Sequence, residues 1–404
     1  MGYRATWDST DQVPERAISA GLLSRFGHID PTDGGHTYRY SLAADVRRSG
    51  LTSSTRASAY VLRYGLNLLS NFTYFLDDPV DGDQLEQADR RVVTGGLVTY
   101  RRLGHLGQRN VESALGVQLR HDAIGASGLY RTTARRRLST TRDDKVGQTS
   151  VGAFAQSEIA WNRSLRTVTG LRSDVYRFNV QAGNPANSGE ETSGLLSPKI
   201  SAVLGPWAST EIYLNAGMGF HSNDARGATI TEDPVTGEPV DRVTPLVRAR
   251  GAEIGLRTAR ISGVQTTVSL WMLGFDSELL FIGDAGTTAA GRPSRRVGVE
   301  WTNYARVAPW LTLDADISFS RARFTEDDSV HSKSTTLVNA EVGYRHFERT
   351  RVMLEVFNML DAKVSDIDYF YTSRLPGEAP EGLDDVHTHP ALPRTARLML
   401  QVSF

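Results

Sequence analysis

Apolar and polar residues alternate along much of the chain, in segments of about ten residues or more. In residues 60–74, apolar side chains such as Tyr60 and Leu62 take the even positions, while Arg63 and Asn67 take odd positions. Because successive side chains of a strand point to opposite faces, this pattern predicts β-strands with one apolar and one polar face. Strands of soluble sandwiches are shorter, typically about 5–6 residues. The lengths favour strands that cross a membrane, with the Tyr60 face toward lipid and the Arg63 face toward the interior.

The alternation recurs often enough to predict about sixteen strands. They are expected near residues 1–8, 36–48, 54–76, 87–101, 110–122, 148–161, 165–181, 195–204, 209–221, 247–258, 264–281, 294–306, 309–324, 334–346, 351–370 and 393–404. Short connections, such as 161–164 and 205–208, contrast with long ones at 9–35, 123–147, 182–194, 222–246 and 371–392. Short turns on one side and long loops on the other are typical of outer-membrane barrels. The predicted fold class is all-β, a transmembrane antiparallel β-barrel, with residues 1–404 as one domain.

Aromatic residues gather at the ends of the predicted strands. Trp161, Trp207 and Trp310 lie at short turns, whereas Tyr74 and Phe220 lie at long loops. Amphipathic rings settle at both interfaces of a membrane, so this placement predicts two aromatic belts.

The bulk composition excludes several other classes of protein. With a mean hydropathy of -0.32, no stretch approaches the roughly 18 apolar residues that a transmembrane helix needs. A net charge of -1 argues against a nucleic-acid partner, and the basic stretch from Arg131 to Arg142 is interpreted as a solvated face. The absence of cysteine excludes disulfides and thiolate zinc sites.

Five segments have a more specific character than alternation alone. They are Leu196-Ser197-Pro198-Lys199-Ile200-Ser201, the stretch from Gly217 to Gly227, Arg248 to Leu256, Glu355-Val356-Phe357-Asn358-Met359-Leu360-Asp361, and Pro393-Arg394-Thr395. In this order they resemble the middle, the penultimate strand and the last strand of the TonB-dependent receptors. The resemblance implies a barrel of about 22 strands with a plugged lumen, of which about sixteen are present here. The plug, the TonB box and a signal peptide are not recognised in the sequence, so we expect the chain to be a C-terminal fragment.

The resemblance also implies a function and a location. Such receptors lie in the bacterial outer membrane and take up scarce nutrients actively, so the chain is expected to transport a siderophore-iron complex, cobalamin or another large solute. The implied partners are outer-membrane lipid, the TonB energy-transducing complex and a small-molecule nutrient. No nucleic acid and no cofactor are implied. The chain is not expected to be an enzyme, because no catalytic motif is present.

Two groups of residues are candidates for substrate contact. His221, Asn223, Asp224 and Arg226 lie where a predicted strand enters a long loop, and polar groups at a barrel mouth can recognise polar ligands. Loop-anchoring hydrogen bonds and an Asp224–Arg226 pair are the structural alternative. The second group, His387 and His389, lies in a Pro-flanked loop near two aspartates.

No metal site is predicted, although two segments carry residue types that can bind metal ions. Imidazole and carboxylate groups near His387 suit divalent ions, but two histidines in such a loop are more often hydrogen-bonded. The acidic stretch that begins at Asp77 fails as an EF-hand, because Pro79 falls at the third ligand position and Ala88 at the twelfth. A solvated loop is the preferred interpretation of that stretch.

Two alternatives to a receptor remain open from the sequence. One is a passive porin of about sixteen strands, which the even strand number permits. The segments 54–76 and 351–370 exceed the roughly 9–11 residues that cross a bilayer, and such overhang favours a receptor. The other is a soluble all-β binding module, which requires the Tyr60 face to be buried in a core.

Overall fold

One large antiparallel sheet dominates the computed structural model, which describes residues 2–8, 12–282, 287–325, 335–346 and 350–402. In the described residues this sheet has sixteen strands, the number predicted. Its first eight strands are β1 (Gly2–Asp8), β3 (Gly34–Ser49), β4 (Ser53–Ser70), β5 (Leu85–Leu106), β6 (Arg109–Thr133), β7 (Arg136–Asn162), β8 (Leu165–Gln181) and β9 (Gly189–Trp207). The other eight are β10 (Thr210–Ser222), β11 (Leu246–Thr258), β12 (Val264–Phe275), β15 (Ser294–Ala308), β16 (Leu311–Phe324), β17 (Thr335–His346), β18 (Thr350–Phe357) and β21 (Thr395–Val402).

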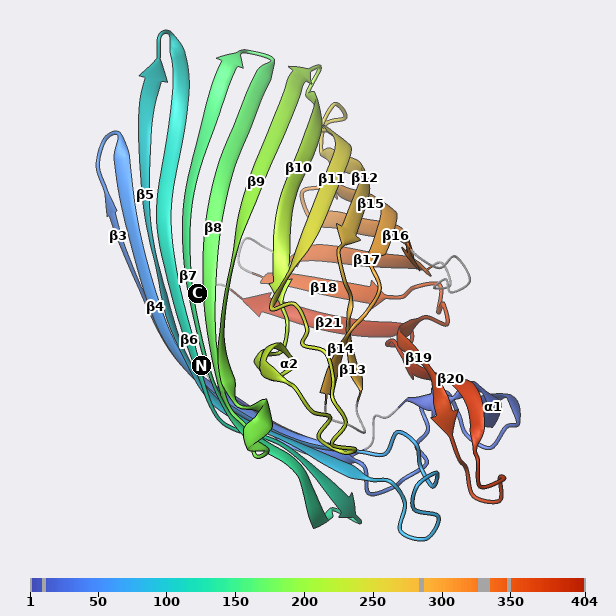
Figure 1. The fold of residues 1–404 in the computed structure, drawn as a ribbon. Helices are drawn as coiled ribbons and strands as arrows, with labels where there is room; N and C mark the ends of the chain where they lie inside the picture. The colour runs from blue at the N-terminus through green and yellow to red at the C-terminus, as the bar shows by residue number, and fades with distance from the viewer. Residues whose placement is uncertain (1, 9–11, 283–286, 326–334, 347–349, 403–404) are drawn as a thin grey trace.

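The sheet is strongly curved but not closed. Figure 1 shows its strands wrapping around a concave interior, with the long-loop ends of β3 to β10 at the bottom of the view. In the described part of the chain, β1 pairs only with β3 and β21 pairs only with β18. The expected terminal strand is therefore present, although residues 403–404 lie outside the described residues. No described helix is long and apolar enough to span a membrane.

Aromatic residues that lie opposite glycines help to fix the register of this sheet. The pairs are Tyr38–Gly65, Tyr60–Gly95, Phe154–Gly116, Tyr213–Gly255 and Trp271–Gly298. A Cβ atom at Gly65 would lie 2.5 Å from the Tyr38 ring, so the ring covers the bare backbone of its partner. Glycine opposite a large ring lets the sheet bend while the ring keeps contact area, which suits a curved wall.

The two faces of the sheet follow from the register. On β6, Leu115 and Leu119 are exposed on the outer face, while Arg120 lies opposite Gly95 and Ser150 on the inner face. The same rows continue to β16, where Asp314 and Asp316 face inward as predicted.

The expected orientation of residues 60–74 is wrong. Tyr60 lies opposite Gly95, in the same inner-face row as Arg120. Arg63 lies opposite Tyr40 and Val92 on the outer face. The alternation identified the strand but not its faces, because polar residues near the end of a strand also face outward once they lie beyond the hydrocarbon core of the membrane.

Several of the expected boundaries also change. Residues 123–147 are not a long loop, because β6 and β7 continue into a tight hairpin whose turn residues Ala134 and Arg135 have positive φ. The expected strand 264–281 divides into β12 and β13 (Leu279–Ile282), which pairs with β14 (Thr287–Ala290). The expected strand 351–370 ends at Phe357, so its length does not support a receptor.

A small structure at the long-loop end joins the beginning and the end of the chain. It consists of β2 (Val13–Pro14), α1 (Glu15–Ser19), β19 (Ser365–Ser373) and β20 (Leu383–Pro390), and we call residues 12–33 together with 364–390 the clasp. Its buried core consists of Val13, Ala17 and Leu375, together with Tyr74 from the loop between β4 and β5. The clasp thus links loops of the first and last strands, although the edge strands themselves do not pair.

Candidate functional site

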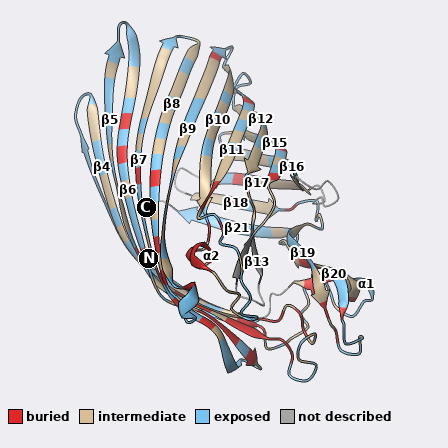
Figure 2. Ribbon diagram, viewed as in Figure 1, coloured by how far each residue is buried: buried red, intermediate tan, exposed pale blue. Residues whose placement is uncertain are grey.

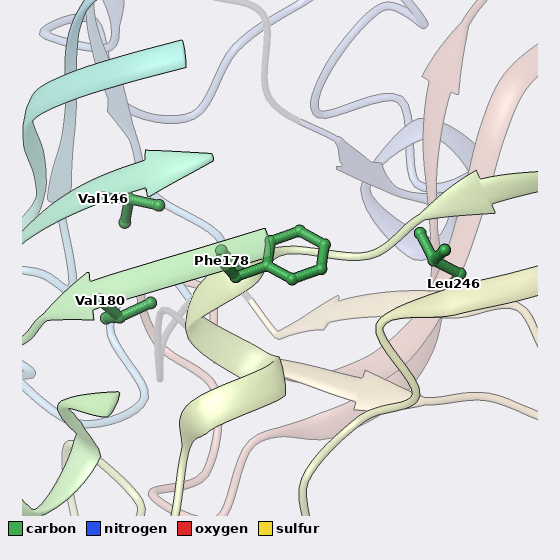
Figure 3. Packing of buried hydrophobic residues seen from close by; sticks show 5 residues of the cluster. Val146, Phe178, Val180 and Leu246 are labelled. Atoms are coloured by element: carbon green, nitrogen blue, oxygen red, sulfur yellow. The ribbon is translucent and has the colours of Figure 1, made fainter. Parts of the chain in front are cut away.

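The loop between β10 and β11 folds inward onto the inner wall. It carries α2 (Ala225–Thr229), and Ala225 packs with Val146, Phe178, Val180 and Leu246 in a buried cluster (Figure 3). Phe178 is fully buried there, and every residue of α2 except the partly buried Arg226 is buried (Figure 2). Apolar side chains on the inner face of β7 and β8 therefore fix the position of this loop in the interior.

The four candidate residues around His221 lie together at the start of this loop. The ring of His221 is hydrogen-bonded to the Asn223 side chain (Nε2 to Oδ1, 3.1 Å), and Asn223 Nδ2 donates to the Thr244 carbonyl at 2.6 Å. Asp224 caps α2 by accepting from the Arg226 backbone N–H, and its side chain pairs with the Arg226 guanidinium at 2.6 Å. The anchoring contacts and the predicted Asp224–Arg226 pair are thus present.

Asp224 is held in its charged form by Arg226. Burial on its own would raise the pKa of Asp224, but the Arg226 charge and its hydrogen bonds outweigh burial and keep that pKa below the ordinary value. Arg226 also approaches Asp144 of β7 at 4.0 Å. The loop is therefore joined to the wall by charge as well as by apolar packing.

The wall beneath carries a regular set of charge pairs, which we call the arginine ladder. In each pair an arginine and an aspartate stand two residues apart, so that both side chains lie on the inner face of one strand. The pairs are Asp89–Arg91 on β5, Arg120–Asp122 on β6, Arg142–Asp144 on β7 and Arg172–Asp174 on β8. Asp224 and Arg226, in the loop that carries α2, have the same spacing.

In the ladder the carboxylates of Asp122, Asp144 and Asp174 are buried, Asp89 is partly buried, and most guanidinium groups face the interior. Asp122 is 5% exposed and accepts two hydrogen bonds from Arg120, at 2.7 and 2.8 Å, whereas Arg120 is 47% exposed. Arg172 repeats this arrangement with Asp174 and also donates to Gln118 at 3.1 Å. Sequence reasoning missed the ladder, although its signal, Arg-x-Asp or Asp-x-Arg on consecutive strands, is readable in the sequence.

The second candidate pair, His387 and His389, belongs to the clasp and not to this site. His387 is fully buried and stacks on Tyr371 with ring centroids 3.7 Å apart. Its Nδ1 lies 3.1 Å from the Asp385 carbonyl, which can only accept, so Nε2 accepts from the Ser373 hydroxyl at 2.7 Å. Burial lowers the pKa of His387 to about 4. Both ring nitrogens are occupied, which gives His387 a structural role.

His389 lies nearer the surface of the clasp. Its Nδ1 is 3.9 Å from Asp366, and its side chain is partly exposed. The structure therefore does not bring His389 into the group around His221, and its contact with substrate stays a prediction.

The acidic loop at Asp77 is organised by its own backbone. The buried carboxylate of Asp83 accepts from the backbone N–H groups of Leu76, Asp77 and Asp78, and from the Thr73 hydroxyl. Its oxygens are thereby used without a cation. Within the described residues, no group of three or more His, Cys, Asp or Glu side chains is arranged to hold a metal ion.

A hollow of about 550 Å³ lies at the short-turn end of the inner wall. It is lined by Pro206, Ser209, Glu211, Arg257, Thr258, Ala259, Gln265, Thr267, Thr302, Asn303, Tyr304, Asp314 and Asp316. Glu211 is paired with Arg257, so the inner wall is polar at both of its ends.

A curved antiparallel wall with a polar interior, an apolar outer face and loops folded in at one end defines an outer-membrane β-barrel protein. The family model of the TonB dependent receptor-like β-barrel matches residues 3–272. The chain belongs to this family, and it is a protein of the bacterial outer membrane.

Solved structures agree with this assignment at the level of the fold. The unliganded ferric citrate transporter FecA aligns with a TM-score of 0.66 and 12% identity, over 99% of this chain and 66% of its own. The ferric yersiniabactin uptake receptor FyuA from Yersinia pestis aligns with a TM-score of 0.67 and 13% identity, over 100% of this chain and 67% of its own. The copper transporter OprC aligns with a TM-score of 0.61 and 14% identity, over 92% of this chain and 67% of its own. No curated protein matched the sequence. The chain spans about two thirds of the length of these structures, which are two transporters and one uptake receptor.

Proposed function

We propose that residues 1–404 form, as one domain, the wall of a receptor for active uptake of a scarce nutrient, such as a siderophore-iron complex or cobalamin. The observation that carries the proposal is the α2 loop, which is fixed inside the wall directly above the arginine ladder. Guanidinium groups with buried carboxylate partners are held in place and can donate to oxygen-rich ligands without large rearrangement. His221, Asn223, Asp224 and Arg226 then stand at the entrance to the path. Energy would come from the TonB complex that gives the family its name.

The open sheet supports a receptor over a sixteen-strand porin. A porin of that size closes by pairing its first strand with its last, because an unpaired edge inside lipid leaves backbone groups without partners. In the described residues, β1 and β21 do not pair, and the clasp spans their loops instead. An open sheet of sixteen strands with this curvature therefore fits a part of the wall of a wider barrel.

Uptake measured in whole cells tests the proposal. Cells that carry the chain in the outer membrane are offered radiolabelled ferric citrate, a ferric catecholate or cobalamin, with and without an uncoupler of the inner-membrane proton gradient. We expect uptake of one solute to stop with the uncoupler and to fall about tenfold in Arg226→Gln, which loses two charge-assisted hydrogen bonds. Arg136→Gln, at the exposed tip of the β6–β7 hairpin, is the matched control and should transport normally.

A passive pore would give the opposite result. Uptake that is unaffected by the uncoupler, together with a large and constantly open conductance in planar bilayers, would assign the chain to the porin class.

A further inference from the structure

Three arginines gather on the outer face of the first strands, near their long-loop ends. One cross-strand row runs from Arg4 on β1 through Tyr38 and Gly65 to Arg90 on β5. Arg63 on β4 lies in the neighbouring row, two residues along its strand. We call Arg4, Arg63 and Arg90 the rim arginines. They share the face of the sheet that carries exposed apolar side chains, so they stand beside the lipid.

Among the described residues, no acidic side chain pairs with the rim arginines. All three are exposed, and none forms an ion pair or a side-chain hydrogen bond with a described residue. By contrast, each ladder arginine on the inner face, such as Arg91 on β5 and Arg120 on β6, has an aspartate partner. A cluster of like charges without counter-charges is unfavourable unless an external anion occupies it.

The height of the cluster matches the headgroup layer of a bilayer. Arg90 and Arg102 lie on the outer face of β5, and the outward residues between them are Val92, Thr94, Gly96, Val98 and Tyr100. The two arginines are about twelve residues apart, which is roughly 41 Å along a strand. At a tilt of about 45° this spans ~29 Å, close to the hydrocarbon thickness of ~30 Å. Arg90 therefore lies at one headgroup level and Arg102 at the other.

The geometry of the cluster suits a phosphate group. Diagonal neighbours on adjacent strands, such as Arg63 and Arg90, have Cα atoms about 7–8 Å apart, within reach of two long side chains. Tyr38 lies flat over Gly65, so no side chain stands between its ring and Arg90. The rings of Tyr38 and Tyr40 are 5.8 Å apart and form an amphipathic surface at the same level. Arginine binds phosphate through a planar fork of two donors.

We propose that the rim arginines bind a phosphate of the phosphorylated glycolipid of the outer leaflet, lipid A. Arg63 and Arg90 hold the phosphate, Arg4 adds charge from the edge strand, and Tyr38 and Tyr40 lie against the boundary between sugar and acyl chains. The long-loop ends of the strands carry this site because they face the leaflet in which lipid A occurs. Anionic headgroups are recognised by such basic clusters next to an apolar span.

Lipid titrations on the full chain in maltoside micelles test this assignment. Native mass spectrometry counts bound diphosphoryl lipid A, dephosphorylated lipid A and phosphatidylglycerol at increasing concentrations. We expect diphosphoryl lipid A to bind at least about tenfold more tightly than the other two lipids, and its binding to weaken with salt. The double substitution Arg63→Gln with Arg90→Gln should lower this affinity roughly tenfold.

The matched control removes the same number of charges from the other rim. Arg48→Gln with Arg102→Gln alters exposed arginines of the same outer face at the short-turn end, and should leave lipid A binding within about twofold. Arg63→Lys with Arg90→Lys keeps the charge and should retain most of the binding, which guards against a folding defect in the glutamine variant. Equal losses in the two glutamine variants, or equal binding of the dephosphorylated lipid or of phosphatidylglycerol, would overturn the proposal.

Discussion

Arg90 and Arg91 are neighbours in the sequence, but they lie in opposite environments. Arg91 points to the interior and is paired through two nitrogens with Asp89. Arg90 stands on the outer face, exposed and without a described protein partner. In the arginine ladder on the inner face, charge is balanced within each strand, because each arginine has an aspartate two residues away. On the outer rim the positive charge of the arginines is not balanced by a described acidic side chain. A negative charge from outside the protein, such as a lipid phosphate, would balance it.

The sharpest test of this contrast is Asp144→Asn, for which we expect the largest effect. Asp144 is 1% exposed, accepts from Arg142 at 2.7 Å and lies 4.0 Å from Arg226. Asparagine keeps the shape but removes the charge that pairs with Arg142 and lies near Arg226, which should lower the free energy of unfolding by about 3 kcal/mol. Urea unfolding in detergent micelles measures the loss. Arg90→Gln on the outer rim should change it by less than about 0.5 kcal/mol, and equal losses would remove the distinction between the two faces.

Acid should open the clasp before it affects the wall. The pKa of His387 is about 4 in the folded clasp and ordinarily near 6.5, so the unfolded clasp binds the proton first. This histidine contributes its full stability above about pH 6.5 and loses it as the pH falls toward 4, by roughly 3 kcal/mol in total. The Arg16 hydrogen bond lowers the pKa of Glu378, whose contribution is lost at still lower pH.

Hydrogen exchange of backbone amides measures this opening. Amides of β20 should lose protection between pH 7 and pH 4.5, whereas those of β8, a strand without histidine, should not. In His387→Asn the protection of β20 amides should no longer depend on pH between pH 7 and pH 4.5. Protection in β20 that stays constant over the range would contradict a neutral, buried His387.

A smaller effect is expected from crowding one ladder pair. A Cβ atom at Gly152 would lie 2.3 Å from Arg172 Nη2 and 2.5 Å from Asp174 Oδ1, so Gly152→Ala must displace the pair. We expect a loss of about 1 kcal/mol in the same unfolding experiment, because the side chains can shift in part. Gly219→Ala is the control, since no atom lies within 4 Å of its Cβ position. Equal stability of the two variants would show that the ladder tolerates displacement.

Part of the candidate site was readable in the sequence. The position of His221 and Arg226 at the start of a long loop predicted that they lie at the mouth of the barrel. The Asp224–Arg226 pair could be predicted because the two residues are only two positions apart. The ladder was equally local, but its meaning depends on four strands standing side by side. The role of His387 was not readable, because its partner Ser373 and the charge of Arg16 reach it only through folding.

The sequence by itself determined the number of strands in the sheet, because alternation and turn residues are local properties that each segment expresses alone. It did not determine the faces. Tyr60 and Arg63 exchange the sides expected of them once their strand pairs with β3 and β5, because register decides which row each side chain joins. Only the tertiary structure could place Arg16 against Glu378 and Asp385, more than 350 residues away, since contacts between loops at opposite edges of a sheet leave no periodic trace in the chain.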